Sequence, residues 1–228
     1  MQKIKDNTKQ KTEIEKKVEK EALKKIKPKH GLWYNILDTG VTLVVFLIIV
    51  ALVRFFLVTP FIVRGSSMVD SFQDGEYIMV DKLSYRLGEI QRGDVVVFTP
   101  PIPNTTDYYI KRVIGLPGET VKIKNKQVWV CNEKNPDCFM LDESLYLNEE
   151  NLGHTCVYGN NCADVEYTVP TNSLFVLGDN RVGSQDSRHF ELHGGTFYVP
   201  IENIEGRGWI GVWPLNKLGI VPQIGYSN

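Results

Sequence analysis

The sequence has no excess of positive charge and contains few histidines. Its 228 residues carry a formal net charge of −1, whereas nucleic-acid-binding domains usually carry a strong basic excess, so no nucleic-acid partner is expected. Only four histidines are present, and no G-x-S-x-G motif surrounds any serine, which argues against a Ser/His/Asp triad. No internal repeat is apparent. With 43% hydrophobic residues, the chain can still bury a sizeable core.

The charge that is present is unevenly distributed, and it borders a long apolar run. Residues 1–30 contain eleven lysines against five acidic residues, and Leu37–Val63 is almost entirely apolar. A signal peptide would have a core of about 7–15 apolar residues and an A-x-A cleavage site, and neither is found. A buried core helix would show polar interruptions, but Thr42 is the only one between Val41 and Val53.

We therefore predict a transmembrane anchor over residues 33–60, preceded by a lysine-rich cytoplasmic tail over residues 1–32. Because lysine-rich flanks stay on the cytoplasmic side, residues 61–228 are expected outside the membrane.

All four cysteines lie within a 32-residue window of the part that is expected outside the membrane: Cys131, Cys138, Cys156 and Cys162. Disulfides persist outside the cytoplasm, so two disulfides are predicted, with all three pairings open. Free thiols are the next alternative. Zinc comes last, because the spacings C-x6-C and C-x5-C are loose for zinc ligands, and no metal site is predicted.

Short runs rich in Val, Ile, Tyr and Trp follow the anchor, separated by Gly, Pro and Asn. This pattern predicts a mainly β domain, and the alternation on both sides of Asn125-Lys126 predicts a hairpin. Between about residues 124 and 170 the apolar runs thin out, which indicates an insertion that carries the cysteines. The predicted strands cover 77–83, 94–99, 108–114, 120–130, 173–178 and 207–215.

Two adjacent serines, Ser66 and Ser67, lie in the stretch RGSSMVD shortly after the anchor, and a serine needs a base to become a nucleophile. His30 precedes the anchor and is on the wrong side. His189 and His193 follow Asp186, but closeness in sequence is not what a triad requires.

Lys111 is the stronger candidate base, because it interrupts Tyr108–Ile114, a run otherwise suited to a buried strand. Burial lowers the pKa of a lysine toward neutrality. The alternative is a lysine on the wet face of a half-buried strand.

Five segments, in order, resemble the motif set of bacterial type I signal peptidases, in particular the Gram-positive branch. They are RGSSM, RGDVVVF (92–98), KRVIGLPGE (111–119), GDNRVGSQDSR (178–188) and IEGRGWIGVWPL (204–215). The resemblance covers the anchor and most of the exported part, but not the lysine-rich tail or the insertion. It implies that family's β-fold for the exported domain.

The resemblance also implies roles for individual residues. Ser67 matches the nucleophile and Lys111 the general base. Ser184 is expected to hydrogen-bond the Lys111 amine, with Asp186 supporting the surrounding site. The Ser67 N–H would stabilise the oxyanion.

Other positions near the predicted site have supporting roles. Gly65 matches a position at which some family members have a hydroxyl that helps to stabilise the oxyanion. Met68 is expected to contact substrate. An ion network of Arg112, Asp179 and Arg181 would fix the Lys111 strand, the alternative being solvated surface charges. Asp94 and Arg188 are interpreted as structural as well.

The implied protein is a serine endopeptidase in the plasma membrane that removes signal peptides, with an A-x-A-like site, from secretory preproteins. Its partners are those preproteins and the lipid bilayer, with a contact to the secretion machinery also considered, and no cofactor is expected. Two alternatives stay open. One is a specialised relative that processes dedicated substrates, and the other is an inactive anchored β-domain that acts as a binding or assembly module.

Asp70 is the main departure from the resemblance, since the family usually has proline at this position. Proline fixes φ, and a carboxylate here could lie near Lys111 and raise its pKa. On this basis Asp70→Pro is expected to raise the cleavage rate at neutral pH.

Overall fold

The computed structural model describes residues 31–83, 85, 88–157 and 162–226, and residues 16, 18 and 20 nearer the N-terminus. The chain forms two compact units, Met1–Ala51 and Leu52–Asn228. The predicted lysine-rich tail, residues 1–32, lies almost entirely outside the described residues, so nothing is concluded about its structure.

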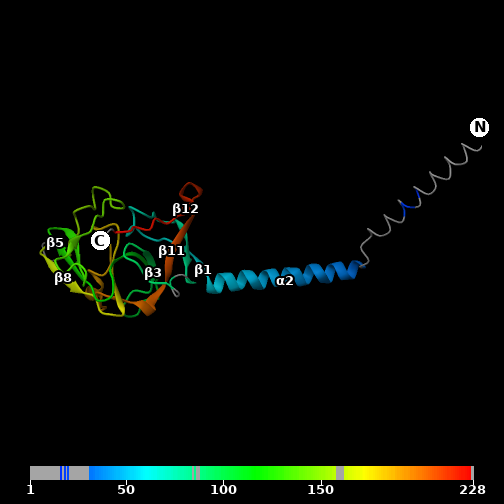
Figure 1. Ribbon diagram of the computed structural model, residues 1–228, viewed down its shortest axis with the longest axis horizontal. Coiled ribbons are helices and arrows are strands. Elements are labelled where there is room, and N and C mark those ends of the chain that lie inside the picture. Colours follow the sequence, from blue (N-terminus) through cyan, green and yellow to red (C-terminus); the bar gives the residue numbers. More distant parts are fainter. Residues whose placement is uncertain are drawn as a thin grey trace, which may run out of the picture. The chain divides into compact units, whose positions relative to one another are not determined.

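One long apolar helix, α2 (Leu32–Phe56), forms as the hydropathy predicts (Figure 1). Its segment Trp33–Val53 has a mean hydropathy of 2.7 and is long and apolar enough to cross a membrane. The hydroxyl of Thr42 donates to the carbonyl of Asp38 at 2.8 Å, so this polar group is satisfied within the helix.

The helix ends earlier than the predicted anchor. A strand, β1 (Val58–Ile62), begins two residues after Phe56, so residues 58–60 of the predicted anchor belong to the sheet. Pro60 is tolerated there because β1 is the edge strand of its sheet.

The larger sheet has eight strands, in the order β1-β2-β11-β3-β4-β9-β10, with β12 pairing β11, and all its pairings are antiparallel. The last long strand in sequence, β11, pairs with both β2 and β3, so a strand near the C-terminus lies in the middle of the sheet. The remaining bounds are β2 (Tyr77–Asp81), β3 (Val95–Phe98), β4 (Tyr109–Gly115), β9 (Ser173–Leu177), β10 (Val199–Pro200), β11 (Ile204–Trp213) and β12 (Gly219–Ile220).

The second sheet has four strands in the order β7-β6-β5-β8, and Figure 1 shows β5 and β8 on the far side of the domain from β1. The predicted hairpin is confirmed: β5 and β6 pair antiparallel, and Asn125 and Lys126 both have positive φ, 51° and 63°, as a tight hairpin turn requires. The bounds are β5 (Thr120–Lys124), β6 (Gln127–Cys131), β7 (Phe139–Met140) and β8 (Val165–Thr168). The described residues also form three short 3-10 helices: η1 (Phe190–His193), η2 (Ile201–Asn203) and η3 (Leu215–Lys217).

The cysteines form two disulfides, Cys131–Cys138 and Cys156–Cys162, so neither the zinc site nor the free thiols are found. The small sheet starts at Thr120, slightly before the predicted start of the insertion at about residue 124.

One apolar cluster joins the two sheets. Val121, Val130 and Tyr167 of the small sheet pack with Phe175 and Leu177 of β9. Burying such side chains stabilises the fold by about 1.5–3 kcal/mol each. The insertion is thus fastened to the large sheet next to the 178–188 segment rather than tethered by its ends alone.

Candidate active site

Ser67 lies in a turn that connects β1 to β2, and local sequence explains its shape. Gly65 adopts φ +82°, a conformation that L side chains rarely adopt, and its N–H donates to Asp74 at 2.7 Å. Beyond Ser67, the N–H groups of Ser71 and Phe72 donate to the carbonyl of Met68. These bonds hold Ser67 at the surface of the turn.

Met68, for which a contact with substrate is predicted, directly follows Ser67. Its side chain is fully buried, packs in the core beneath the turn, and accepts a hydrogen bond at its sulfur from the N–H of Asp179 at 3.4 Å. An unbranched apolar side chain fills such a space well. Met68 therefore anchors the turn, and only its neighbours face the cleft.

Lys111 lies on β4 and reaches the serine. Its Nζ donates to the Ser67 Oγ at 2.7 Å and to the Ile110 carbonyl at 2.8 Å, and the side chain of Lys111 is 3% exposed. β4 is buried on both faces, so the alternative of a solvated lysine on a wet face is excluded.

Burial dominates the acid–base behaviour of this lysine. Loss of hydration lowers the pKa of Lys111 to about 8, against the raising effect of Asp186 and Asp179, while Arg188 lowers it further. The aromatic ring of Tyr109 lies 5.2 Å from the amine. A substantial fraction of the amine is therefore neutral slightly above physiological pH.

A third segment, residues 178–188, packs against the turn. The backbone N–H of Asn180 donates to the carbonyl of Ser67, and its side-chain amide donates to the carbonyl of Ser66. A Cβ on Gly178 would collide with Ser184 and with the Ser67 carbonyl, so only glycine allows these segments to approach so closely.

Ser184 does not form the predicted bond to Lys111. Its hydroxyl is buried and makes no hydrogen bond, while the Lys111 amine bonds to Ser67 and Ile110 instead. Asp186 does lie close enough to act on Lys111 electrostatically. Burial alone would raise the pKa of Asp186, but the Arg188 guanidinium and the Gly178 N–H hold it at about 2.

The predicted arginine–carboxylate network is buried, but one of its pairs differs from the prediction. Arg112 binds Asp179 through two bonds of 2.9 and 2.7 Å, whereas Arg181 pairs with Glu143 at 2.9 and 2.5 Å. The partner was missed because Glu143 lies in the insertion among many other acidic residues, with nothing in the sequence to single it out. Asp94 lies 3.5 Å from Arg207, and Arg188 binds Asp186. These five predicted residues are at most 5% exposed, which excludes solvated surface charges.

A cleft of about 590 Å³ opens over the serine–lysine pair. Residues 61–66 line one wall and residues 107–110 the other, and Ser67 and Lys111 lie between them. Phe61 and Tyr108 meet edge to face across the walls, with ring centroids 5.3 Å apart. The cleft is thus bordered by apolar side chains and by backbone that belongs to a sheet edge.

Histidine is not part of this cleft among the described residues. His189 Nδ1 lies 3.8 Å from Asp186, and burial lowers the pKa of its imidazole, but it does not line the space around Ser67. The histidine alternative therefore lacks the contact between base and nucleophile that a triad needs.

A family model described as signal peptidase, peptidase S26, matches residues 36–213, which include Ser67, Lys111 and the 178–188 segment. The chain belongs to this signal peptidase family. The signal peptidase is similar to signal peptidase I of Bacillus caldolyticus, with 35% identity over 74% of this chain and 87% of the relative. It is also similar to signal peptidase I T of Bacillus subtilis (strain 168), with 30% identity over 80% of this chain and 88% of the relative. A solved structure of a signal peptidase I from Enterococcus faecalis V583 aligns with a TM-score of 0.38 and 32% identity, covering 52% of this chain and 96% of its own.

These matches confirm the resemblance predicted from the motifs. The signal peptidase is a serine endopeptidase, and its apolar helix fits a single-pass membrane protein. The alternative of an inactive binding module is not favoured.

Asp70 of the signal peptidase points toward the insertion. Its Oδ2 accepts hydrogen bonds from the Asn148 N–H and the Asn151 side-chain amide, both at 3.0 Å. The carboxylates that act on Lys111 are Asp186 and Asp179. The predicted gain from Asp70→Pro therefore loses its electrostatic basis.

Proposed function

We propose that Ser67 is the nucleophile and Lys111 the general base with which this signal peptidase cleaves secretory preproteins. The observation that carries the proposal is the 2.7 Å contact between the Lys111 Nζ and the Ser67 Oγ at the base of an open cleft. A general base must lie within hydrogen-bond reach of the proton that it removes.

The reaction then follows from this geometry. Once the Lys111 ammonium has lost its proton, its lone pair accepts the Ser67 hydroxyl hydrogen as Oγ attacks the scissile carbonyl carbon. The tetrahedral intermediate collapses, the C–N bond breaks, and Lys111 returns the proton to the leaving amine. Water then attacks the ester under the same base, which releases the signal peptide and restores Ser67.

Negative charge on the carbonyl oxygen needs a donor, and the Ser67 N–H is the proposed one. Gly65 brings no hydroxyl to this place, so a second donor would be a backbone group or water. A donor aimed at the developing charge is worth several kcal/mol in other hydrolases, about 2.7–4 for one side-chain amide.

The substrate fits the cleft as an extended chain. β1 is an edge strand, and the pairing of β4 with β9 begins only at Arg112, so the backbone of residues 109–111 is open on that side. An added strand can pair with such edges, and shallow apolar pockets accept the small side chains of an A-x-A site.

The location belongs to the same proposal. The enzyme is anchored in the plasma membrane by α2, with the lysine-rich tail in the cytoplasm and residues 61–228 outside. Ser67 follows the helix closely in sequence, which suits cleavage near the membrane surface. Since preproteins arrive from the secretion machinery, a contact with it is included in the proposal.

Cleavage assays with the detergent-solubilised protein test the assignment. A preprotein with an A-x-A site is incubated with wild type, Ser67→Ala and Lys111→Ala, and the new N-terminus of the product is sequenced. Both variants should lose at least about 10³-fold in kcat, as hydrolases do when nucleophile or base is removed.

Ser66→Ala and His189→Ala are the matched controls. Ser66 lines the cleft next to Ser67, but its hydrogen bond with the Asn180 side chain uses the backbone carbonyl, which alanine keeps, so Ser66→Ala tests the second serine hydroxyl alone. His189 lies outside the cleft. Cleavage that survives Lys111→Ala but is lost in His189→Ala would overturn the assignment in favour of a histidine base.

A further inference from the structure

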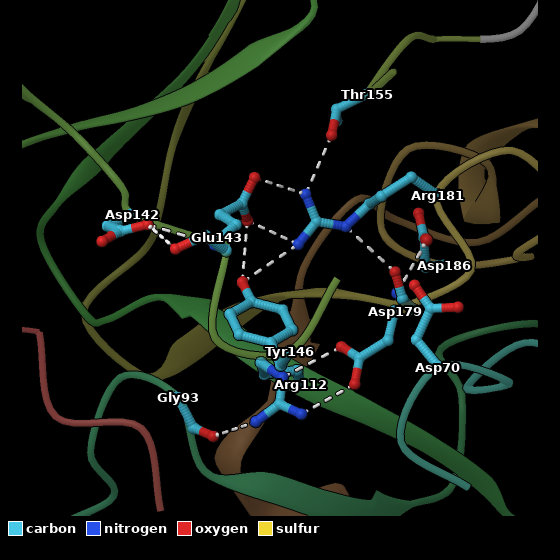
Figure 2. Close-up of polar contacts among 12 residues, drawn as sticks. Asp70, Gly93, Arg112, Asp142, Glu143, Tyr146, Thr155, Asp179, Arg181 and Asp186 are labelled. Carbon is cyan, nitrogen blue, oxygen red and sulfur yellow. Dashed lines mark hydrogen bonds and ion pairs between the residues drawn. The ribbon is translucent and has the colours of Figure 1, made fainter. Parts of the chain in front are cut away.

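Part of the insertion contacts the buried polar cluster of Arg112, Asp179 and Arg181 behind the site. In the segment 142–155, Glu143 is 4% exposed and Thr155 fully buried, and both contact Arg181 of the 178–188 segment. Figure 2 shows the Tyr146 ring between the guanidinium groups of Arg181 and Arg112, with Glu143 beside that of Arg181. The insertion thus supplies side chains to the same cluster that surrounds Lys111.

Glu143 neutralises a charge that has no access to water. The side chain of Arg181 is 0% exposed, and its Nη1 and Nη2 donate to the two carboxylate oxygens of Glu143. Arg181 also donates to the carbonyl of Gly178 at 3.1 Å and to the hydroxyl of Thr155 at 2.8 Å. A buried guanidinium must be paired, and the pair here comes from the insertion.

Tyr146 connects the two arginines. Its ring lies 4.1 Å from the Arg112 guanidinium carbon, and its hydroxyl donates to Glu143 at 2.8 Å. The same hydroxyl accepts hydrogen bonds from Arg181 at 3.2 Å and from the Tyr226 hydroxyl at 2.8 Å. Such a network is stabilising when every member is satisfied.

The two arginines in turn fix the site. Arg112 holds Asp179, whose carboxylate accepts from the Ser71 hydroxyl and whose N–H bonds to Met68, so Asp179 clamps the turn that carries Ser67. The carbonyl of Arg181 accepts from Arg188, and Arg188 binds Asp186.

The charged groups that face Lys111 all belong to this cluster or its surroundings. They are Asp179, Asp186 and Arg188 from the 178–188 segment, with the Tyr109 ring from its own strand. Arg181 lies close enough to Asp179 for the two charges to interact, although its own partner is Glu143.

We propose, on the basis of the Ser67/Lys111 assignment above, that Glu143 and Tyr146 of the insertion are positioning residues for this pair. Glu143 keeps Arg181 neutralised so that Asp179 stays with Arg112, and Tyr146 holds the two arginines in register. The insertion is then a working part of the active site and not a separate module.

The proposal has an electrostatic consequence that simple packing lacks. Glu143→Gln keeps the size and shape of the side chain but leaves the Arg181 charge uncompensated. The extra positive field disfavours the ammonium form of Lys111, and Arg181 competes with Arg112 for Asp179. The pH at which kcat/KM is half-maximal should therefore fall, together with the plateau rate.

The experiment compares kcat/KM against pH for wild type, Glu143→Gln and Glu143→Asp in detergent, with one preprotein. Glu143→Gln should lower the midpoint by about half a pH unit or more, which corresponds to an approximately threefold change in the acid dissociation constant of Lys111. Glu143→Asp keeps the charge and should keep the wild-type midpoint, whatever its rate. If both variants lose rate and neither midpoint moves, the role is merely structural and the proposal is overturned.

A double variant, Glu143→Gln/Arg181→Met, removes both charges of the pair. It should return the midpoint to the wild-type value while the plateau kcat stays at least about fivefold low with KM little changed. The plateau stays low because methionine cannot replace the bonds of the Arg181 guanidinium to the Tyr146 hydroxyl and the Gly178 carbonyl, so Tyr146 no longer holds the two positions in register. A midpoint as low as that of Glu143→Gln would overturn the electrostatic role. If Glu143→Gln does not fold, the double variant decides, and a wild-type plateau together with a wild-type midpoint would overturn the proposal.

Failure here is distinguishable from failure of the proposed function. Cleavage that survives Ser67→Ala or Lys111→Ala removes the assignment itself. If those alanine variants are inactive and the Glu143→Gln midpoint is unmoved, only the role of the insertion is wrong.

Discussion

Lys111 is held in surroundings that disfavour its own charge. Its amine is buried beneath the turn of Ser67, and the loss of hydration outweighs the attraction of Asp186 and Asp179. A solvated lysine would stay protonated at neutral pH and could not accept a proton from serine. The environment of this one residue therefore decides whether the pair can react.

The pH dependence of cleavage follows from the same balance. With Lys111 as the proposed general base, its neutral amine is the reactive form. The rate constant kcat/KM should then rise with pH and reach half its plateau near pH 8, because burial lowers the pKa of Lys111 to about 8. The measurement is a kcat/KM profile from about pH 6 to pH 10 with a substrate lacking ionisable groups near the cleaved bond. A profile that is flat across this range would contradict a lysine base.

At the scale of elements, the connection between the turn after Ser67 and the insertion is direct. Asp70 receives two hydrogen bonds from Asn148 and Asn151, and the side-chain oxygen Oδ1 of Asn151 accepts from the Val182 N–H of the 178–188 segment. Three segments far apart in sequence thus meet beside Ser67. Asp70 thus joins the turn after Ser67 to this chain's own insertion.

Replacing Asp70 should loosen that junction. Asp70→Ala leaves two donors of the insertion without their acceptor, and hydrogen bonds to a charged group contribute about 1.5–3 kcal/mol, so the free energy of unfolding should fall by about 1–2 kcal/mol after partial compensation by water. Urea denaturation of the detergent-solubilised protein measures the change. Asp70→Asn, which keeps an acceptor oxygen, should lose less, and equal stability of wild type and Asp70→Ala would contradict this junction.

Local pattern predicted most elements, but not which of them meet. The alternation around Asn125-Lys126 was enough for the β5–β6 hairpin, because two adjacent strands and their turn are local. The position of β11 between β2 and β3, the Arg181–Glu143 pair and the burial of Met68 depend on pairing and packing between distant segments. No periodicity in a single sequence records such contacts. Ser67 and Lys111 were predicted mainly through the resemblance, because a lysine in an apolar strand usually lies on the solvated face of a half-buried sheet.

At the scale of the whole molecule, two features support the proposed orientation of the chain in the membrane. An apolar helix divides a lysine-rich start from a β-domain, and all four cysteines of that domain are paired in disulfides. Disulfides persist in oxidising surroundings outside the cytoplasm. The substrates of a signal peptidase also become accessible on that side of the membrane.

The orientation can be tested through the charges that should determine it. Residues 1–30 hold eleven lysines, whereas residues 57–76 on the other side of α2 hold one basic residue, Arg64. This asymmetry should keep the N-terminus in the cytoplasm. An alkaline phosphatase fused after Asn228, which is active only outside the cytoplasm, should therefore be active, and a green fluorescent protein fused there should be dark. Replacing the eleven lysines by glutamine should lower the phosphatase activity per molecule, because the retention signal is lost. Bright fluorescence from a fusion at the C-terminus of the native sequence would contradict the predicted orientation. It would place the β-domain in the cytoplasm, on the opposite side of the membrane from any exported substrate.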